Sequence, residues 1–334
     1  MGLEVNLMKA IVQDRYGSTA VLRSDDVEPP RPTDHQVLVR VRCASVNALD
    51  WHIMMGTPFV VRLLTGLSRP KVRVRGRDLS GIVEECGASV TRWKPGDPVF
   101  GTASGTFAEF VTTPESDLSA KPPNVTFAAA ASVPVAGVTA LQAIRDHGHQ
   151  QPGQRIIVYG AGGGVGTMAV QVARSLGGHV TAVTSTDKVD LLESLGAETV
   201  IDYSRTDFAD GQQRYDLFID VGADRKLPDC LRVLAREGTY VGVGSPPDAG
   251  MVSTLAGLIG QKLASAFVHQ RLASFVAKPN QRDLDLLGQL MSSKSLQPVI
   301  GHRFPFRETA AAIDFLHTGH PRGKVIVEVT EGED

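Results

Sequence analysis

The spacing of hydrophobic and polar positions differs between the two ends and the middle of the chain. Near the start, VLVRVRCASV (37–46) alternates with period two, which predicts a strand with Cys43 on the same buried face as Val37, Val39 and Val41. A Pro-Gly turn inside WKPGDPVFG then precedes another apolar strand. The first 125 or so residues are therefore predicted to be mainly strand, with further strands at 79–86, 97–101 and 106–114.

The pattern changes near Thr126, where alanine-rich sequence predicts two helices. One is expected to begin near Phe127 and the other near Gly137. Pro134 lies between these starts and is expected to separate the helices, because proline disrupts a helix interior.

From Gly153 the chain alternates between buried strands and helices. RIIVYG (155–160) predicts a strand, and a helix is expected from Thr167 to Leu176, ending at two glycines. The same alternation continues with a strand at 179–185, a helix at 188–195, and strands at 199–203, 215–222, 238–244 and 271–279. Such alternation is typical of an α/β fold class with a doubly wound parallel sheet, that is, a Rossmann domain.

The last part of the chain returns to the style of the first. Two helical stretches (283–293 and 308–319) precede a final strand at 323–329. We expect this tail to fold back and complete the first domain. The predicted domains are therefore residues 1–128, a middle domain of 129–280, and a completing segment of 281–334.

Composition narrows the class of protein. A length of 334 residues suits about two domains, and a net charge of −2 does not favour a nucleic acid or another polyanion as partner. No apolar run approaches the ~20 residues that span a bilayer, and the start lacks the pattern of a secretory signal. The three cysteines form no CxxC pair, so we expect no disulfide framework and a reducing, cytoplasmic setting.

The segment VYGAGGGVGTMAVQVAR (158–174) carries the clearest chemical signal. It follows a predicted strand, opens a predicted helix and fits the pattern AxGxxG, which is the context of a dinucleotide-binding loop. Backbone N–H groups at the start of that helix would face a pyrophosphate. The predicted cofactor-binding residues of the loop are Ala161, Gly163, Gly164, Val165 and Gly166. The alternative is a tight turn without a ligand.

The next strand bears on the choice of nucleotide. An acidic residue at its end would bind the ribose of NAD, whereas VTSTDK (183–188) places Ser185 there and a cation at Lys188. Tyr203, at the end of the third strand, is expected to cover the same pocket. Asp187 argues for NADH, but it lies beyond the expected position. The segment favours NADPH, with a solvated helix-start lysine as the alternative for Lys188.

Several segments together resemble a known family. They are ASVNALDWHIMMG (44–56), GRDLSGIVEECGASVTRWKPGDPVFG (76–101), PVAGVTALQAI (134–144), GAGGGVGTMAVQVAR (160–174), SLGAETVIDY (194–203) and GKVIVEV (323–329). In this order they resemble the medium-chain dehydrogenase/reductase superfamily and its zinc-independent NADPH:quinone oxidoreductase branch. The resemblance implies a GroES-like catalytic domain built from both chain ends, a central Rossmann domain and a homodimer.

The same resemblance argues against a catalytic zinc. Zinc-containing members carry a ligand cysteine where Asn47 stands, and a His-Glu pair where Arg77 and Asp78 stand. Arg77 and Asp78 are expected to form a structural ion pair. His52 remains, but a lone imidazole beside Trp51 is expected to be a hydrogen-bonded structural residue.

The resemblance also implies site residues. Asn47 is expected beside the nicotinamide and the substrate, against the alternative of a structural turn residue. Asp50 is the second catalytic candidate, although capping a helix would explain it equally well. Thr139, Gly244 and Ser245 are expected near the nicotinamide.

Two further segments are expected near the substrate. Residues 275–278 are candidates for closing the cleft. The apolar segment 54–70 is expected to line an apolar substrate pocket, form a lid, or cover the core as a helix.

These features predict hydride transfer from NADPH to a quinone or an α,β-unsaturated carbonyl. Without zinc, a developing enolate or phenolate needs a hydrogen-bond donor and a proton. Two alternatives remain open: an enoyl-thioester reductase and a non-catalytic NADPH-binding protein. The sequence does not identify the physiological substrate.

Overall fold

The computed structural model describes residues 7–221, 225–243, 268–318 and 321–330. The chain divides into two compact units. The first unit comprises Met1–Val135, Pro279–Ser292 and Ile300–Asp334, so it contains both ends of the chain. The second unit comprises Ala136–Lys278 and Ser293–Val299.

The first unit is built on a mainly antiparallel sheet. Its strand order is β14-β15-β3-β4-β5-β7, with β6 also paired to β3. The bounds are β3 Gln36–Val46, β4 Asp78–Cys86, β5 Pro98–Thr102, β6 Phe110–Pro114, β7 Leu118–Ala120, β14 Ile300–Pro305 and β15 Lys324–Glu328. Strand β15 pairs antiparallel with β3, so the end of the chain joins the sheet of the first unit. A separate hairpin joins β1 (Met8–Val12) to β2 (Arg23–Val27).

Strand β3 departs from the simple alternation expected of it. Its pairing with β4 shifts register between Val41 and Cys43. Cys43 is buried as predicted, but it packs with Ala128 and Ala131, whereas Val41 and Ala44 belong to the larger core cluster. A bulge adds a residue to one strand and reverses the faces beyond it, so the predicted shared face of Cys43 and Val41 is wrong.

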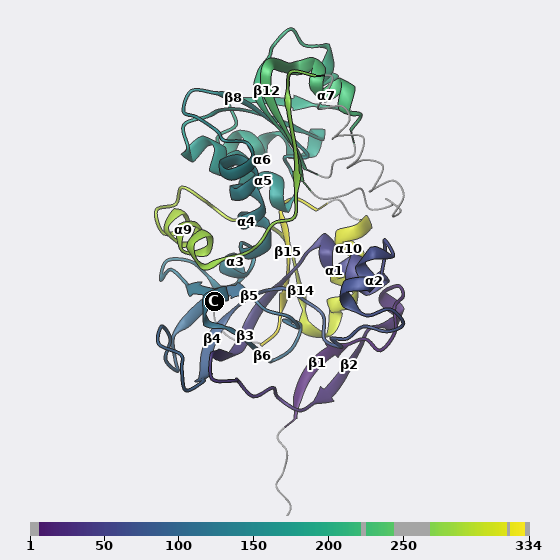
Figure 1. Cartoon of the computed structure of the whole chain (residues 1–334), viewed down its shortest axis with the longest axis vertical. Coiled ribbons are helices and arrows are strands. Elements are labelled where there is room, and N and C mark those ends of the chain that lie inside the picture. Colours follow the sequence, from purple (N-terminus) through teal and green to yellow (C-terminus); the bar gives the residue numbers. More distant parts are fainter. Residues whose placement is uncertain (1–6, 222–224, 244–267, 319–320, 331–334) are drawn as a thin grey trace, which may run out of the picture. The chain divides into compact units, whose positions relative to one another are not determined.

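Among the described residues, the helices that accompany this sheet are α1 (Ala48–Met55), α2 (Val60–Thr65), α3 (Phe127–Ala131), α9 (Gln281–Ser292) and α10 (Thr309–Thr318). Helix α10 lies beside α1, although the two are far apart in the sequence, and α2 lies next to α1 (Figure 1). Trp51 of α1 stacks on His317 of α10 with ring centroids 3.9 Å apart. The tail therefore fixes the position of α1, which carries one candidate catalytic residue.

The second unit contains a fully parallel sheet in the order β10-β9-β8-β11-β12-β13. Its strands are β8 Arg155–Tyr159, β9 His179–Thr184, β10 Thr199–Asp202, β11 Tyr215–Val221, β12 Leu234–Val243 and β13 Arg271–Phe275. This order places the first strand beside the fourth, as in doubly wound dinucleotide-binding folds. The predicted α/β fold class, a GroES-like mainly-β domain plus a Rossmann domain, is confirmed.

Helix α4 precedes this sheet in the chain, and further helices lie between its strands. They are α4 (Pro134–Gln142), α5 (Gly164–Ser175), α6 (Val189–Ser194) and α7 (Leu227–Val233), and Figure 1 shows α5 and α6 beside the sheet. Pro134 separates α3 from α4 as expected, but α4 begins at Pro134 itself and not near Gly137, because proline fits the first helical turn. Helix α5 starts three residues before the predicted Thr167, directly after Gly163.

Candidate functional site: a buried polar network, a cavity and a glycine loop

Asn47 and Asp50 lie where β3 gives way to α1. Asn47 is the residue before the helix, and Asp50 is its third residue. The Asn47 N–H donates to Asp50 Oδ2 over 2.8 Å, which holds this carboxyl at the start of the helix. Both side chains are buried, Asn47 at 8% and Asp50 at 2% exposure. Asp50 therefore caps the start of helix α1, which was one of the two interpretations of its position in the sequence.

A network centred on Asp78 lies next to this turn. Asp78 Oδ2 accepts from Ser45 Oγ at 2.6 Å, from Asn47 Nδ2 at 2.9 Å and from Lys324 Nζ at 3.4 Å. Asp78 Oδ1 accepts from the Val135 N–H at 2.9 Å. Lys324 Nζ also donates to Asn47 Oδ1 at 2.6 Å. We call Ser45, Asn47, Asp78 and Lys324 the Asp78 network.

The Asp78 network corrects one expectation and refines another. The ion pair of Asp78 is with the buried Lys324 at the start of β15, not with Arg77. The Asn47 amide contacts both members of that ion pair, so its oxygen and one N–H are already engaged. Asn47 is therefore placed to hold the turn that presents Asp50.

Asp50 has an unusual protonation equilibrium. Burial raises the pKa of its carboxyl to about 7, and the negative charge of Asp78 adds to the effect. The hydrogen bond from Asn47 and the positive charges of Lys324 and Arg77 oppose the rise. A carboxyl with a pKa near neutrality can hold and release a proton at physiological pH.

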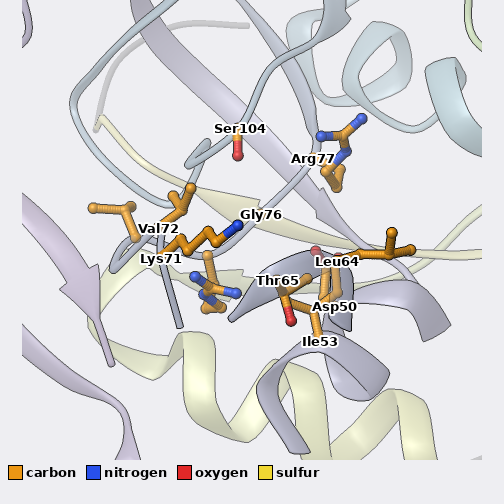
Figure 2. Close-up of a pocket in the computed structure, with 11 residues that line it drawn as sticks. Asp50, Ile53, Leu64, Thr65, Lys71, Val72, Gly76, Arg77 and Ser104 are labelled. Atoms are coloured by element: carbon orange, nitrogen blue, oxygen red, sulfur yellow. The ribbon is translucent and has the colours of Figure 1, made fainter. Parts of the chain in front are cut away.

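A cavity of about 210 Å³ lies in the first unit and is lined in part by Asp50. Figure 2 shows Asp50 and Ile53 of α1 beside Leu64 and Thr65 of α2, with Lys71 extending toward the middle of the group. The other lining residues are Val72, Val74, Arg75, Gly76, Arg77 and Ser104. No residue of α2 is buried, and Leu64 and Thr65 line the pocket, whereas Met54 at the start of the 54–70 segment is fully buried in the core.

His52 lies on the same helix as Asp50 and bears on whether this region binds a metal ion. His52 Nδ1 is hydrogen-bonded to the carbonyl oxygen of Thr57 at 3.0 Å, which confirms its structural role. In the described ranges, no group of three or more His, Cys, Asp or Glu side chains gathers as metal ligands would. The position beside Asn47 and Asp78 instead holds the Lys324 ammonium group.

The glycine loop of the second unit joins β8 to α5. Gly160 has a φ of +73°, a conformation that favours glycine. A Cβ at Gly166 would lie 2.2 Å from the Gly160 carbonyl oxygen, so only glycine allows the helix to approach the strand so closely. A Cβ at Gly163 would meet nothing nearer than 3.7 Å, which leaves open space before the N-terminus of α5. This cradle fits a dinucleotide pyrophosphate.

The residues after β9 lie next to this loop. Strand β9 ends at Thr184, so the predicted hydroxylic strand end at Thr184 and Ser185 is correct. Lys188 is 9% exposed and lies against the loop, since a Cβ at Gly162 would come within 2.4 Å of Lys188 Cδ. Asp187 accepts a hydrogen bond from Ser185 Oγ, in keeping with its position beyond the strand end.

Tyr203 follows β10 and lies beside the same strand end. Its N–H donates to the Thr184 carbonyl oxygen at 3.0 Å, and its half-exposed ring is 6.5 Å from that of Tyr159. The carboxylate of the preceding residue, Asp202, accepts a hydrogen bond from Thr186 Oγ1 and pairs with Arg205 at 3.3 Å. The Asp202 charge is therefore already engaged by protein groups.

The remaining predicted site residues fall in different places. Thr139 is half-buried on α4, in the second unit. Gly244 and Ser245 lie outside the described residues. Phe275 ends β13 and stacks on His147 with centroids 4.1 Å apart, while the Lys278 N–H donates to Gln142 Oε1.

Two residues of the site were missed by sequence reasoning. Lys324 is visible in the sequence as the lysine of GKVIVEV, but its partner Asp78 is 246 residues away. Arg75, which lines the cavity and is 5% exposed, is one of several arginines in VRVRGRD. Local spacing gave no sign that either charge would be buried.

Together these features define a class of protein, a two-domain oxidoreductase that uses a nicotinamide cofactor. Residues 33–123 match the family model described as an alcohol dehydrogenase GroES-like domain, and residues 195–327 match one described as a zinc-binding dehydrogenase. The chain belongs to the medium-chain dehydrogenase/reductase superfamily, in its quinone oxidoreductase-like branch. The resemblance inferred from the sequence is thereby confirmed.

Three similar proteins illustrate this membership. The human mitochondrial NAD(P)H oxidoreductase RTN4IP1 is 33% identical, in an alignment covering 97% of this chain and 89% of the relative. The 2-methylene-furan-3-one reductase of Solanum lycopersicum is 30% identical, over 96% of this chain and 79% of the relative. The solved quinone oxidoreductase of Coxiella burnetii has a TM-score of 0.85 and 31% identity, covering 97% of this chain and 100% of that one.

The described helices also bear on membrane insertion. None of them combines the length and the apolar character that crossing a bilayer requires. The cytoplasmic setting and the homodimer stay predictions.

Proposed function

We propose that this enzyme transfers hydride from NADPH to a conjugated carbonyl compound, a quinone or an α,β-unsaturated ketone, without a catalytic zinc. The observation that carries the proposal is the buried carboxyl of Asp50, which lines the cavity and has a pKa of about 7. The names of the tomato and Coxiella burnetii relatives, a furanone reductase and a quinone oxidoreductase, support this substrate class.

The second unit would hold the nucleotide. The N–H groups before α5 face open space at Gly163 and would bind the pyrophosphate. The Lys188 ammonium group and the Ser185 hydroxyl would bind a 2′-phosphate, because β9 ends at Thr184 and is followed by Ser185, without an acidic residue at the position that binds the ribose of NAD. Thr139, Gly244 and Ser245 are proposed to contact the nicotinamide half.

In the first unit, the residues would act on the substrate's oxygen and its proton. A bound nicotinamide supplies the hydride. The protonated Asp50 carboxyl would donate a hydrogen bond to the substrate carbonyl and then deliver its proton as negative charge develops there. Asn47 would keep Asp50 in place through the N–H donated to Asp50 Oδ2.

The donor set beside Asp50 favours chemistry without zinc. Asn47 and Arg77 are poor zinc ligands, and the Asp78 carboxylate is paired with the Lys324 ammonium group. A divalent cation there would have to displace a buried positive charge. The Lys324 ammonium group instead stabilises the geometry that holds Asn47.

Loss of NADPH absorbance in stopped-flow measurements tests the proposal. The acceptor panel contains benzoquinones, simple enones and a crotonyl thioester, with and without a metal chelator. We expect turnover of quinones or enones that the chelator leaves unchanged. Tight NADPH binding without turnover of any acceptor would indicate a non-catalytic binding protein, and faster reduction of the thioester would indicate an enoyl-thioester reductase.

A further inference from the structure

Helix α2 and the loop after it expose many apolar side chains. In the part of the chain that the structure describes, ten large hydrophobic residues are exposed, and six of them lie between residues 59 and 72. They are Phe59, Val60, Leu63, Leu64, Leu67 and Val72, with Leu64 at 79% exposure. Scattered exposed apolar residues are ordinary, whereas a concentration of them marks an interaction surface. We call these six residues the 59–72 patch.

The contacts of α2 turn its cation inward and its apolar side chains outward. Arg62 is half-buried, and its Nε donates to the Gly56 carbonyl oxygen at 3.0 Å. The Arg62 guanidinium also lies 4.6 Å from the centre of the Tyr16 ring. These contacts hold α2 so that its exposed residues are all apolar, namely Val60, Leu63 and Leu64. A surface helix normally presents its polar face to water, so this orientation is the reverse of the usual one.

The loop after α2 folds tightly beside the helix. The Lys71 N–H donates to the Thr65 carbonyl oxygen at 2.8 Å, which closes the loop. Gly66, with a φ of +123°, allows this turn, since a Cβ there would lie 2.1 Å from the Arg69 carbonyl oxygen. Leu67 and Arg69 are both exposed within the closed loop. The loop therefore holds apolar and cationic side chains close together at the surface.

The cavity that Asp50 lines adjoins the same surface. Leu64, Lys71 and Val72 line this cavity, and all three side chains are exposed. Figure 2 shows them around the cavity together with Asp50. The cavity therefore opens beside the 59–72 patch.

The charges around the 59–72 patch are predominantly positive. Residues 51–77 contain six lysines and arginines and no aspartate or glutamate. Arg69 and Lys71 are exposed, and their side chains form no ion pair with any described residue. Arg73, by contrast, is paired with Asp14 at 2.7 Å. Two exposed cations beside the apolar side chains are complementary to a negatively charged partner.

We propose that the 59–72 patch docks the protein on the surface of an anionic lipid bilayer. Leucine and phenylalanine side chains that enter the headgroup region, beside cations that face the lipid phosphates, are typical of such docking. The patch provides three leucines and Phe59, next to Arg69 and Lys71. Docking there brings the opening of the cavity to the bilayer. The inference goes beyond the proposed function and does not depend on it, because docking requires neither cofactor nor turnover.

Two other occupants fit the patch less well. A second copy of the chain, docked patch to patch about a two-fold axis, would bring Arg69 and Lys71 close to the same cations of its partner. The residues that contribute most to protein–protein binding are mainly Trp, Tyr and Arg, whereas Leu and Val are under-represented among them. Five of the six patch residues are Leu or Val.

Sedimentation with lipid vesicles tests the proposal on the full chain. The probes are vesicles of phosphatidylcholine alone and of phosphatidylcholine mixed equally with phosphatidylglycerol, which is anionic. We expect wild type to bind the mixed vesicles at least about tenfold more tightly than the neutral ones, because each cation near the surface contributes about fivefold. Added salt should reduce this preference.

Two double variants separate the apolar and the cationic contributions. Leu63→Ser with Leu67→Ser should weaken binding to the mixed vesicles by at least about tenfold, because both side chains are exposed and would otherwise leave water. Arg69→Gln with Lys71→Gln should reduce the preference for anionic vesicles to within about threefold.

Each double variant has a matched control at exposed positions outside the patch. Leu7→Ser with Val276→Ser controls for the leucine variant, and Arg31→Gln with Lys94→Gln controls for the charge variant. Both controls should bind within about twofold of wild type. The midpoint of thermal unfolding checks that every variant is folded.

Three results would overturn the proposal. One is wild-type protein that stays in the supernatant with both kinds of vesicle. Another is a loss of binding in the control variants equal to that in the patch variants, because binding would then not depend on the patch. The third comes from light scattering without lipid: an oligomer that Leu63→Ser with Leu67→Ser converts to a monomer, together with no vesicle binding, would assign the patch to contacts between copies of the chain.

Discussion

Two groups of buried polar side chains in the first unit have opposite hydrogen-bonding states. In the Asp78 network, the carboxylate accepts from Ser45, Asn47, Lys324 and a backbone N–H. In the second group, which consists of Arg75, Arg77 and Thr106, four buried side-chain atoms have no hydrogen-bond partner among the described residues, and two of them are Arg75 Nε and Nη2. The carboxylate of the first group is hydrogen-bonded within the protein, whereas the second group leaves buried donors without acceptors.

The comparison predicts that breaking the complete network has the largest effect. Lys324→Met would leave the Asp78 carboxylate buried without its cation, and we expect a loss of about 3–5 kcal/mol in the free energy of unfolding. Urea denaturation measures it. Lys94→Met, at an exposed lysine, is the control and should stay within about 0.5 kcal/mol of wild type.

A second variant sharpens this result. Combining Lys324→Met with Asp78→Asn removes both charges, so it should recover part of the stability that Lys324→Met loses. A loss of less than about 1 kcal/mol in Lys324→Met would contradict a structural role for the ion pair.

Asp50 accepts a hydrogen bond from Asn47 of the Asp78 network, and Asp50→Asn is expected to have the second-largest effect. Asp50→Asn keeps the shape but removes the proton, so kcat should fall by about 100-fold with either quinones or enones. The acid form is the active one, so wild-type activity should decline as pH rises through about 7, and this decline should be absent from Asp50→Asn.

The matched control for Asp50 is an exposed carboxylate. Asp34→Asn should retain both the rate and the pH profile of wild type. If Asp50→Asn keeps the pH dependence of wild type, another group delivers the proton.

Lys188 extends the comparison to the second unit, where a buried lysine lies against the glycine loop. Lys188→Met should weaken NADPH binding by about 10- to 100-fold and leave NADH binding unchanged, because only NADPH carries the 2′-phosphate. Fluorescence titration with both nucleotides measures the two affinities. Equal weakening for both would assign Lys188 a structural role at the loop.

The smallest expected effect is that of replacing Arg75, which belongs to the group with unpaired donors. Because Arg75 Nε and Nη2 have no acceptor, Arg75→Met should leave the midpoint of thermal unfolding unchanged or raise it slightly. Differential scanning calorimetry without substrate measures the midpoint. A drop comparable to that of Lys324→Met would mean that Arg75 has structural partners and would remove the contrast between the two groups.

The glycine loop and the strand–helix alternation were readable from the sequence because they depend on neighbouring residues. Ala161, Gly163 and Gly166 lie between a strand and a helix, and their spacing alone reports a close backbone turn. The position of Ser185 after the second strand follows from the same local pattern. The shift of β3 at Cys43 was not readable, because a bulge is defined by the partner strand.

The candidate site was readable only in part. Asn47 and Asp50 were identified through a family resemblance, and the capping role of Asp50 follows from its place in α1. The pairing of Asp78 with Lys324 was missed, and an ion pair with Arg77 was expected instead. Neighbouring charges in a sequence suggest a pair, but their side chains in an extended segment point to opposite sides.

The sequence by itself determined the two kinds of domain, the nucleotide loop and the absence of zinc-type ligands at positions 47 and 77, since each depends on residue type and local spacing. Only the tertiary structure decided which charges are satisfied. Burial depends on strands brought together from distant parts of the chain, and desolvation acts on the assembled environment. That environment raises the pKa of Asp50 to about 7, pairs Lys324 with Asp78, and leaves Arg75 without a partner in the described structure.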